Sequence, residues 1–219
     1  MEAKMGEIRK KEKSMEIEEI KKIYSSQSAI YDLIFKRFFY PRQEYVIKSL
    51  NIQPHQKLLD VGVGTGLTFD LYPKHCCVTA IDLSARMLKK ANKKIRENDY
   101  SHISLLEMDA THLAFPEDTF DYVVATFVMS VVPDPIRVLS EMKRVSKKEG
   151  KIIIVNHFLS QNRLLAKIEE LISPLCTRVG WRSDLPLDYL VEEGGLCIDM
   201  KYKVKKLDLW NVVLATNNK

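Results

Sequence analysis

A short segment between residues 60 and 66 combines a carboxylate with three regularly spaced glycines. Asp60 is followed by Gly62, Gly64 and Gly66, and an apolar run typical of a buried strand precedes it. Glycine allows backbone angles, and a close approach of a ligand to the backbone, that a side chain would block. The alternating spacing differs from the Gly-x-Gly-x-x-Gly pattern that binds a dinucleotide pyrophosphate. Asp60 would also repel a pyrophosphate, so the pattern favours a ligand that carries positive charge.

A second carboxylate, Asp82, closes the next apolar run, 22 residues after Asp60. An acidic residue at about this distance from a glycine turn accepts hydrogen bonds from ribose hydroxyls in nucleotide-binding folds. The pair therefore predicts a site for a cationic ligand that contains a ribose. The sequence shows no convincing set of metal ligands, because its cysteines lack a metal-binding spacing, and we expect no metal.

The glycine turn needs a rigid sheet to hold it, and the sequence alternates between strand and helix patterns. Apolar runs at residues 57–61, 78–82, 103–108, 120–129 and 151–155 predict five strands. Apolar residues at helical spacing follow the N-cap candidate Ser84 through residue 98, and a second helix is predicted from Asp134-Pro135 to a stop at Gly150. Runs near 200–208 and 211–216 predict an antiparallel edge hairpin. The expected fold is α/β, with a Rossmann-like, doubly wound, mostly parallel seven-stranded sheet.

The remaining segments predict helices outside this sheet. Residues 1–35 indicate a charged helical N-terminal arm, and residues 36–219 indicate one Rossmann-like domain with a helical insertion at about 159–184. In that insertion an apolar stripe recurs at helical spacing. It is a second candidate for membrane contact, although such a stripe is more often core packing, and it could also form a roof over an acceptor pocket. The stripe comprises Leu164, Leu165, Ile168, Leu171, Ile172 and Leu175.

The glycine turn and the carboxylates Asp60 and Asp82 resemble those of the class I S-adenosylmethionine-dependent methyltransferases. The resemblance implies S-adenosyl-L-methionine as methyl donor, with its adenine beside Asp109-Ala110 and its methionine part beside residues 127–130. A degenerate NAD site or a vestigial nucleotide fold is the alternative. On the methyltransferase interpretation, the candidate cofactor-binding residues are Tyr24, Asp60, Gly62, Gly64, Thr65, Gly66, Asp82, Leu83, Met87, Asp109, Ala110, Phe127 and Ser130.

Further motifs resemble the bacterial soluble phosphatidylethanolamine N-methyltransferases, over about residues 24–215. They are Tyr31-Asp32, Phe39-Tyr40-Pro41-Arg42, Tyr72-Pro73, Ser130-Val131-Val132-Pro133-Asp134-Pro135, Asn156-His157-Phe158 and Gly180-Trp181-Arg182-Ser183-Asp184. Where that group has Pro-Gly-Arg, this chain has Pro41-Arg42-Gln43. The resemblance implies Tyr31 and His157 as catalytic residues, and Tyr40, Arg42, Trp181 and Arg182 as substrate-binding residues.

The residue types fit these roles, although each has an ordinary structural alternative. Arg42 and Arg182 could hold a lipid phosphate through paired hydrogen bonds, or form surface ion pairs. Tyr24 and Tyr31 could close over the cofactor, or serve as helix-packing residues. His157 follows the fifth strand, at the edge where open α/β sheets bind ligands, or is a satisfied imidazole near the core.

Other acceptors remain as alternatives. Ornithine lipid, a quinone precursor or another hydrophobic acceptor would suit the same donor site, and so would a non-catalytic cofactor-binding protein. Nucleic acid is not expected, because residues 125–130 (Ala-Thr-Phe-Val-Met-Ser) replace the Asn/Asp-Pro-Pro-Tyr element of amino-base methyltransferases. The charge excess, 34 basic against 29 acidic residues, is also mild for a nucleic-acid binder.

A lipid substrate requires contact with a membrane surface. The longest apolar stretch, residues 122–133, is too short to span a bilayer. We expect a cytoplasmic protein that associates weakly with the inner leaflet through its N-terminal arm, where Ile8, Ile17 and Ile20 alternate with charges. The alternative is that this arm only covers the cofactor. The oligomeric state is not indicated.

Overall fold

A computed structural model of the 219-residue chain describes residues 40–178, 182–204 and 209–219. The predicted N-terminal arm, including Tyr24 and Tyr31, lies outside the described residues, and so does Trp181. Within the described residues, no helix is both long enough and apolar enough to cross a bilayer.

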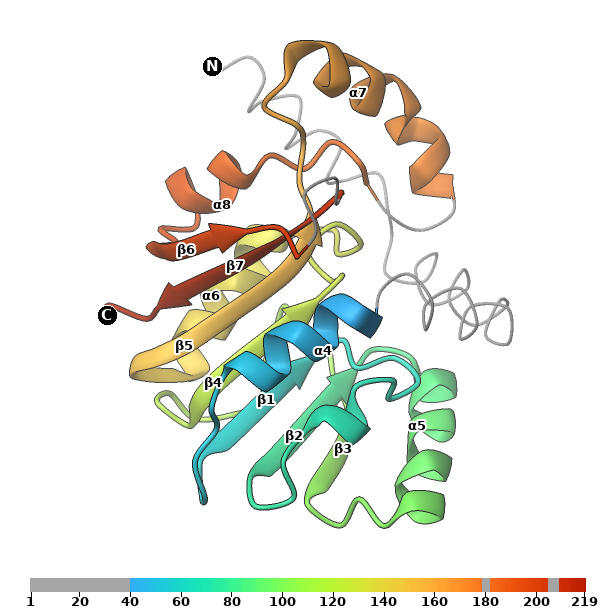
Figure 1. The fold of residues 1–219 in the computed structure, drawn as a ribbon, viewed down its shortest axis with the longest axis vertical. Coiled ribbons are helices and arrows are strands. Elements are labelled where there is room, and N and C mark those ends of the chain that lie inside the picture. Colours follow the sequence, from blue (N-terminus) through green and yellow to red (C-terminus); the bar gives the residue numbers. More distant parts are fainter. Residues whose placement is uncertain (1–39, 179–181, 205–208) are drawn as a thin grey trace.

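The centre of the structure is a seven-stranded sheet with the order β3-β2-β1-β4-β5-β7-β6 (Figure 1). Neighbouring strands among β1 to β5 are parallel, and β7 runs antiparallel to both β5 and β6. This arrangement confirms the predicted α/β fold and its antiparallel C-terminal edge. The strands are β1 (Lys57–Val61), β2 (Cys77–Asp82), β3 (Ile103–Glu107), β4 (Phe120–Thr126), β5 (Ser146–His157), β6 (Ile198–Tyr202) and β7 (Trp210–Thr216).

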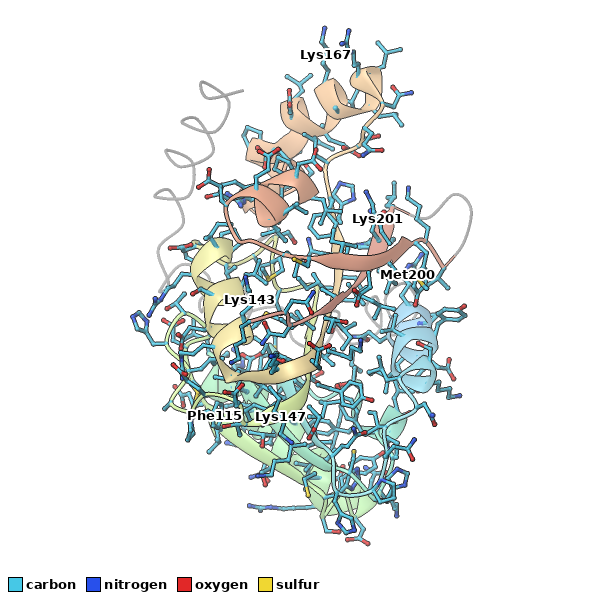
Figure 2. The ribbon with its side chains drawn as sticks, turned by 90° about the vertical axis from the view of Figure 1, so that its left-hand side faces the viewer. Phe115, Lys143, Lys147, Lys167, Met200 and Lys201 are labelled. Atoms are coloured by element: carbon cyan, nitrogen blue, oxygen red, sulfur yellow. The ribbon has the colours of Figure 1, made fainter. Side chains whose placement is uncertain are left out.

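Helices cover both faces of the sheet, because successive strand residues point to opposite sides. In β5, Ile152 and Ile154 join a core with α6 (Pro135–Val145) and α8 (Leu187–Glu192). Ile153, between them, joins a second core with α4 (Tyr40–Ser49), the 3-10 turn η1 (Phe69–Leu71) and α5 (Ala85–Asn98). Helix α7 (Arg163–Arg178) stands beyond the end of the sheet in both views (Figures 1 and 2).

The two helix starts that were predicted from the sequence are confirmed. The Ser84 hydroxyl accepts a hydrogen bond from the Met87 backbone N–H and caps α5. The Asp134 side chain accepts from the Arg137 N–H at 2.8 Å, with Pro135 in the first turn of α6. Both caps satisfy N–H groups that a helix leaves unpaired at its start.

The predicted end of α6 at Gly150 is wrong. The helix ends at Val145, and Ser146 already begins β5. The side-chain amide of Asn217 donates to the carbonyls of Lys143 at 2.8 Å and Ser146 at 3.0 Å. A residue from the far end of the chain therefore satisfies the last turn, and no glycine is needed there.

Two further predictions are corrected. Strand β4 ends at Thr126 instead of residue 129, because Phe127 takes a left-handed conformation with φ of 62°. The apolar stripe of α7 is not core: its six side chains are between 41% and 81% exposed. Helix α4 was not predicted from the sequence at all.

Candidate active site

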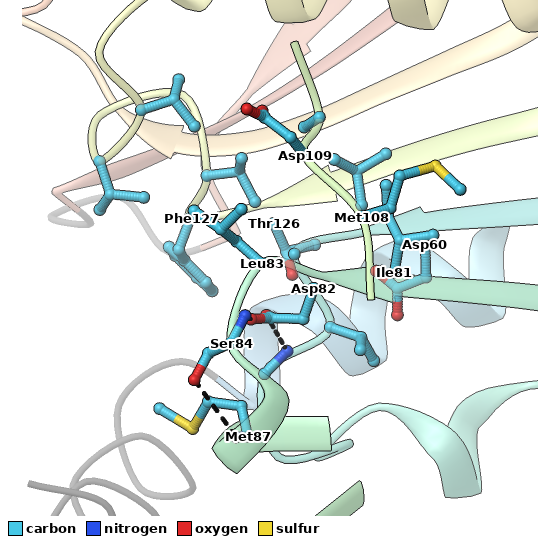
Figure 3. A pocket seen from close by; sticks show the side chains of 18 of the residues that line it. Asp60, Ile81, Asp82, Leu83, Ser84, Met87, Met108, Asp109, Thr126 and Phe127 are labelled. Carbon is cyan, nitrogen blue, oxygen red and sulfur yellow. Dashed lines mark hydrogen bonds between the residues drawn. The ribbon is translucent and has the colours of Figure 1, made fainter. Parts of the chain in front are cut away.

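A cavity opens at the carboxyl ends of β1, β2 and β4 (Figure 3). Its empty volume, including the open mouth, is about 1180 Å³. The sheet order reverses between β1 and β4, and ligands of open α/β sheets bind outside the strand ends at such a point. The fold therefore places a ligand site where the glycine turn was expected to lie.

The three glycines of the turn all have positive φ, between 58° and 74°. A Cβ at Gly62 would lie 2.4 Å from Val128, and one at Gly66 would lie 2.3 Å from the Phe69 ring. A Cβ at Gly64 would meet nothing within 4 Å. Gly62 and Gly66 are thus required by packing, whereas Gly64 leaves its space open at the cavity.

Asp60 lies at the base of the cavity and is 1% exposed. Its Oδ2 accepts hydrogen bonds from the hydroxyls of Tyr72 at 2.7 Å and Thr68 at 3.0 Å. Burial raises the pKa of Asp60 to about 6, and the nearby Asp82 adds to the rise, although the two hydroxyls oppose it. A cationic ligand would stabilise the ionised form of this carboxyl.

Asp82 ends β2 beside the glycine turn. Its two oxygens accept from the backbone N–H groups of Gly64 and Ser84, each at 2.8 Å. Burial raises the pKa of Asp82, and these two hydrogen bonds oppose the rise. An ionised carboxylate offers about four acceptor positions, so the fixed carboxylate can still accept from two ligand hydroxyls.

The wall beyond Asp82 is mostly apolar. Leu83, Met87, Met108 and Ala110 line it, with Asp109 and Thr111 at its polar edge. Asp109 accepts from the Thr111 N–H at 2.8 Å, which fixes the bend after β3. A narrow apolar wall with a polar edge suits a planar heterocycle.

The opposite wall begins at Phe127, whose backbone N–H donates to the Val155 carbonyl at 2.7 Å. Its ring packs edge-on against Trp210, with ring centroids 6.4 Å apart. A non-glycine residue with positive φ is uncommon and concentrates at functional sites. The strain is held by β5 and β7, which places the Phe127 ring at the cavity.

Gln43 of α4 also lines the cavity and was not among the predicted site residues. Its Nε2 donates to Thr126 Oγ1 at 2.8 Å, and the side chain is 7% exposed. Its Oε1 has no hydrogen-bond partner among the residues that the structure describes. A buried carbonyl left in this state suits a ligand donor such as an ammonium group. No local motif marks Gln43, and only its place next to Arg42 in the second resemblance pointed to this region.

A second polar cluster lies beside the cavity, at the end of β5. His157 Nδ1 is 2.9 Å from the Leu209 carbonyl oxygen, and His157 Nε2 is 3.6 Å from Glu169 Oε1. Glu169 Oε2 also accepts from the Ser160 N–H at 2.7 Å. The cluster is largely buried, with His157 7% exposed. Glu169, which sequence reasoning missed, therefore connects α7 to the histidine.

Arg182 is bound through its backbone to the turn that follows β4. Its backbone N–H donates to the carbonyl of Ser130 at 2.8 Å, and Ser130 in turn contacts the Asn156 side chain. Only 6% of the surface of Arg182 is exposed. Within the described part of the chain, its Nε and Nη2 have no hydrogen-bond partner. A buried guanidinium in this state is a strong candidate for binding an anionic group of a ligand.

Most of the predicted cofactor residues lie together at the cavity. Gly66 and Ser130 belong to the same turns without lining the cavity itself, and Tyr24 is outside the described residues. The residues that line it are Asp60, Gly62, Gly64, Thr65, Asp82, Leu83, Met87, Asp109, Ala110 and Phe127. Most of the residues that were predicted from the sequence to bind the cofactor therefore line one cavity in the fold.

The predicted substrate residues are more scattered. Tyr40 donates its hydroxyl to Asp70 at 2.6 Å, and Arg42 stacks over the Trp210 ring at 4.4 Å from its centroid. Neither side chain lines the cavity, and neither does His157 or Arg182. Across the described residues, no group of three or more His, Cys, Asp or Glu side chains could hold a metal ion.

Comparisons with known proteins agree on the family. The pattern of the methyltransferase domain family matches residues 59–154. A phosphatidylethanolamine N-methyltransferase of Cereibacter sphaeroides is 39% identical over 183 residues, which covers 83% of this chain and 89% of that protein. A demethylmenaquinone methyltransferase of Anoxybacillus flavithermus is 35% identical over 146 residues, covering 62% of this chain and 61% of that protein.

Solved structures show the same fold at low sequence identity. A SAM-dependent methyltransferase of Thermotoga maritima superposes with a TM-score of 0.68 at 19% identity, over 90% of this chain and 99% of that one. The YcgJ protein of Bacillus subtilis gives 0.66 at 20% identity, over 74% and 72%. With its glycine turn, paired carboxylates and sheet order, the chain belongs to the class I S-adenosylmethionine-dependent methyltransferases.

Proposed function

We propose that the protein transfers methyl groups from S-adenosyl-L-methionine to the amine headgroup of phosphatidylethanolamine. Its mono- and dimethyl forms would be further substrates, on the way to phosphatidylcholine. The observation that carries this proposal is the buried guanidinium of Arg182, whose Nε and Nη2 have no hydrogen-bond partner among the described residues. It is supported by the 39% identity to a relative that is named for this activity.

The donor cavity fits S-adenosylmethionine group by group. Asp82 would accept from the ribose hydroxyls, and the apolar wall at Met87 and Met108 would receive the adenine. Asp60 and the free carbonyl oxygen of Gln43 would face the positive end of the methionine part. The open space at Gly64 lets the ligand approach the backbone.

Bound S-adenosylmethionine supplies an electrophilic methyl group and a good leaving group. The chain therefore has to hold an amine in line with that methyl group and to exclude misaligned acceptors. The amine lone pair forms the new N–C bond, while the S–C bond breaks and its electron pair stays on sulfur to give S-adenosylhomocysteine. The amine must be deprotonated before attack, so a proton acceptor is needed.

In this proposal the pair of His157 and Glu169 takes that proton. The Leu209 carbonyl fixes the ring through Nδ1, which leaves Nε2 directed toward Glu169 at 3.6 Å. Tyr31 was the other catalytic candidate and stays a prediction, because it lies outside the described residues.

A quinone precursor is the rival acceptor, because several relatives of 32–35% identity are named demethylmenaquinone methyltransferases. A neutral quinone ring offers carbonyl oxygens as acceptors but carries no anionic group to balance the charge of Arg182. Burying an unpaired cation costs free energy, so retaining one is explained more simply by an anionic substrate. The phosphate of a phospholipid provides that anion, and the same argument applies to the phosphate of each methylated form.

A protein that acts on a bilayer lipid would bind the membrane from one side. We therefore propose a cytoplasmic protein that associates peripherally with the inner leaflet, without a nucleic-acid partner. The predicted N-terminal arm, residues 1–35, keeps its proposed roles as cofactor cover or membrane contact.

The test is methyl transfer from labelled S-adenosylmethionine to mixed vesicles. One set contains phosphatidylethanolamine and another contains a quinone precursor, each in the same phosphatidylglycerol background. The proposal expects label in mono-, di- and trimethylated phospholipid, and none in the quinone. Label in the quinone alone would show that the lipid assignment is wrong, and binding of the donor without transfer to either would indicate a non-catalytic protein.

A further inference from the structure

Helix α7 is amphipathic, but its apolar side faces away from the protein instead of toward the core. The six apolar side chains of its stripe are 41–81% exposed, Leu171 and Leu164 most of all at 81% and 75%. At 100° per residue they occupy an arc of about 120° on one side of the helix. Six exposed large apolar residues on one helix form a contiguous patch rather than scattered surface residues.

The opposite side of α7 is polar and faces the protein. Ser173 is 3% exposed, and Glu169 contacts both the Ser160 N–H and His157. The hydroxyl of Ser183 donates to the Glu169 backbone carbonyl at 2.7 Å. These contacts fix which side of the helix points inward, so the apolar side cannot turn to the core without breaking them.

The charges on the exposed surface of α7 are basic. Arg163 and Lys167 are exposed and lie one turn apart on the flank of the helix next to Leu171, with Lys167 about 40° and Arg163 about 80° beyond the edge of the apolar arc. The acidic residues Glu169 and Glu170 are only partly exposed and belong to the inner side. An apolar face with a basic margin is the pattern of helices that lie in the plane of an anionic membrane surface.

We propose that the outward face of α7 is the surface by which the protein docks on an anionic lipid bilayer. The helix would lie in the headgroup plane, with its leucines and isoleucines in the upper acyl region and Arg163 and Lys167 at lipid phosphates. Its inner face carries Glu169, so the bilayer would lie directly across α7 from the His157 cluster. The proposal rests on the proposed function for its biological meaning, but docking is measurable without catalysis.

The position of α7 agrees with this arrangement. In both views the helix forms one end of the molecule, and Lys167 points outward from it (Figure 2). At the other end of the molecule α5 lies beside β3, and its apolar residues Met87, Leu88 and Ala91 are buried. Docking through α7 would therefore hold the sheet end-on to the membrane, with its cofactor edge toward the lipid.

The test measures sedimentation of the full chain with vesicles that contain neither phosphatidylethanolamine nor donor. Vesicles of equal parts phosphatidylglycerol and phosphatidylcholine are compared with pure phosphatidylcholine. The double variant Leu164→Gln/Leu171→Gln should lower the partition coefficient on the anionic vesicles by roughly tenfold or more, because two large apolar side chains no longer insert. Lys167→Glu should lower it several-fold on the anionic vesicles only.

The matched control is Leu106→Gln/Met200→Gln, which changes two exposed apolar residues on the edge strands β3 and β6. It should bind vesicles like the unchanged protein. Equal binding by the α7 double variant would overturn the proposal. A change in that variant from dimer to monomer without vesicles would also overturn it, because the helix would then be a contact between copies. A lowered melting temperature with unchanged vesicle binding would overturn it as well, because another part of the chain would then cover the helix.

Methylation of a short-chain, monomeric phosphatidylethanolamine separates docking from chemistry. The α7 double variant should retain that activity while losing activity on vesicles. If the unchanged protein methylates neither the short-chain phosphatidylethanolamine nor the vesicle form, the proposed function is wrong. The vesicle-binding result then still decides the docking proposal.

Discussion

At the scale of single residues, the site depends on carboxylates that the fold keeps in a low-dielectric place. Asp60 is held by two hydroxyl donors yet burial still raises its pKa to about 6. The cavity thus contains a carboxyl whose ionised form a bound cation would stabilise. Such a perturbed group in a cleft is typical of a functional site.

The raised pKa of Asp60 makes stability depend on pH in a defined direction. The folded chain holds a proton on Asp60 up to about pH 6, whereas the unfolded chain releases it near 3.8. Stability should therefore fall between pH 4 and 6, by roughly 3 kcal/mol from this group as an order of magnitude. In Asp60→Asn this part of the slope should be absent in urea unfolding series at each pH. Asp99→Asn, the same change at an exposed carboxyl, should keep it; an unchanged slope in Asp60→Asn would contradict the burial argument.

Arg182 and Arg144 provide a contrast between a guanidinium kept for a ligand and one used by the fold. Arg144 pairs with Glu141 at 2.9 Å and donates to the carbonyls of Phe115 and Leu113. Arg144→Gln should lower the melting temperature with little change in KM for lipid. Arg182→Gln should raise the KM for phospholipid about tenfold or more and should not lower the melting temperature, because it removes a buried charge whose Nε and Nη2 have no partner among the described residues. The reverse pattern in steady-state kinetics and thermal melts would remove Arg182 from the substrate site.

At the scale of elements, the glycine turn serves folding and binding with different glycines. Ala at Gly66 meets the buried Phe69 ring at 2.3 Å in addition to its positive φ, whereas Ala at Gly64 meets nothing within 4 Å. We expect Gly66→Ala to lose about 2–4 kcal/mol of unfolding free energy from strain and overpacking. Gly64→Ala should lose only about 1 kcal/mol but weaken donor binding more strongly. Denaturant titration and calorimetry measure the two effects separately, and equal stability losses would contradict this division.

The end of α6 depends on a side chain from the C-terminus. Asn217 is 2% exposed, and its amide donates to carbonyls at the end of the helix. Asn217→Ala should lower the unfolding free energy by about 1–3 kcal/mol, because it leaves buried carbonyls without a donor. Asn218→Ala, at the exposed neighbour, should change it by less than about 0.5 kcal/mol. Similar unfolding midpoints for the two variants in urea would show that the cap contributes nothing.

At the scale of the whole molecule, the donor cavity, the His157 cluster and α7 all lie at the carboxyl end of the parallel strands. The doubly wound sheet produces this grouping, since each strand delivers its following loop to the same edge. Ser130 connects Arg182 to Asn156: its carbonyl accepts from the Arg182 backbone N–H, and its side chain contacts the Asn156 side chain. One end of the sheet thus holds the cavity, the His157 cluster and α7 together, and these are the elements that the two proposals use.

Much of this could be predicted from the sequence, because local signals and the glycine turn agree. Ser84 and Asp134 mark their helices by local capping chemistry, and Asp60 and Asp82 mark their strand ends by position. The end of α6 could not be predicted, since its cap comes from Asn217. Gln43 was missed for a similar reason, because only the fold brings α4 to Thr126 and the cavity. The α7 stripe was misread because its periodicity reveals an apolar side without saying where that side points.

The central claim is that the cavity between Asp60 and Asp82 binds the methyl donor. Isothermal titration of S-adenosylhomocysteine into the purified chain measures this directly, since no acceptor or turnover is required. One molecule per chain should bind, and Asp82→Ala should weaken binding by roughly tenfold or more through the lost ribose contacts. Asp99→Ala should bind like the unchanged protein. No detectable heat of binding with the unchanged protein, or equal affinity in Asp82→Ala, would contradict the account.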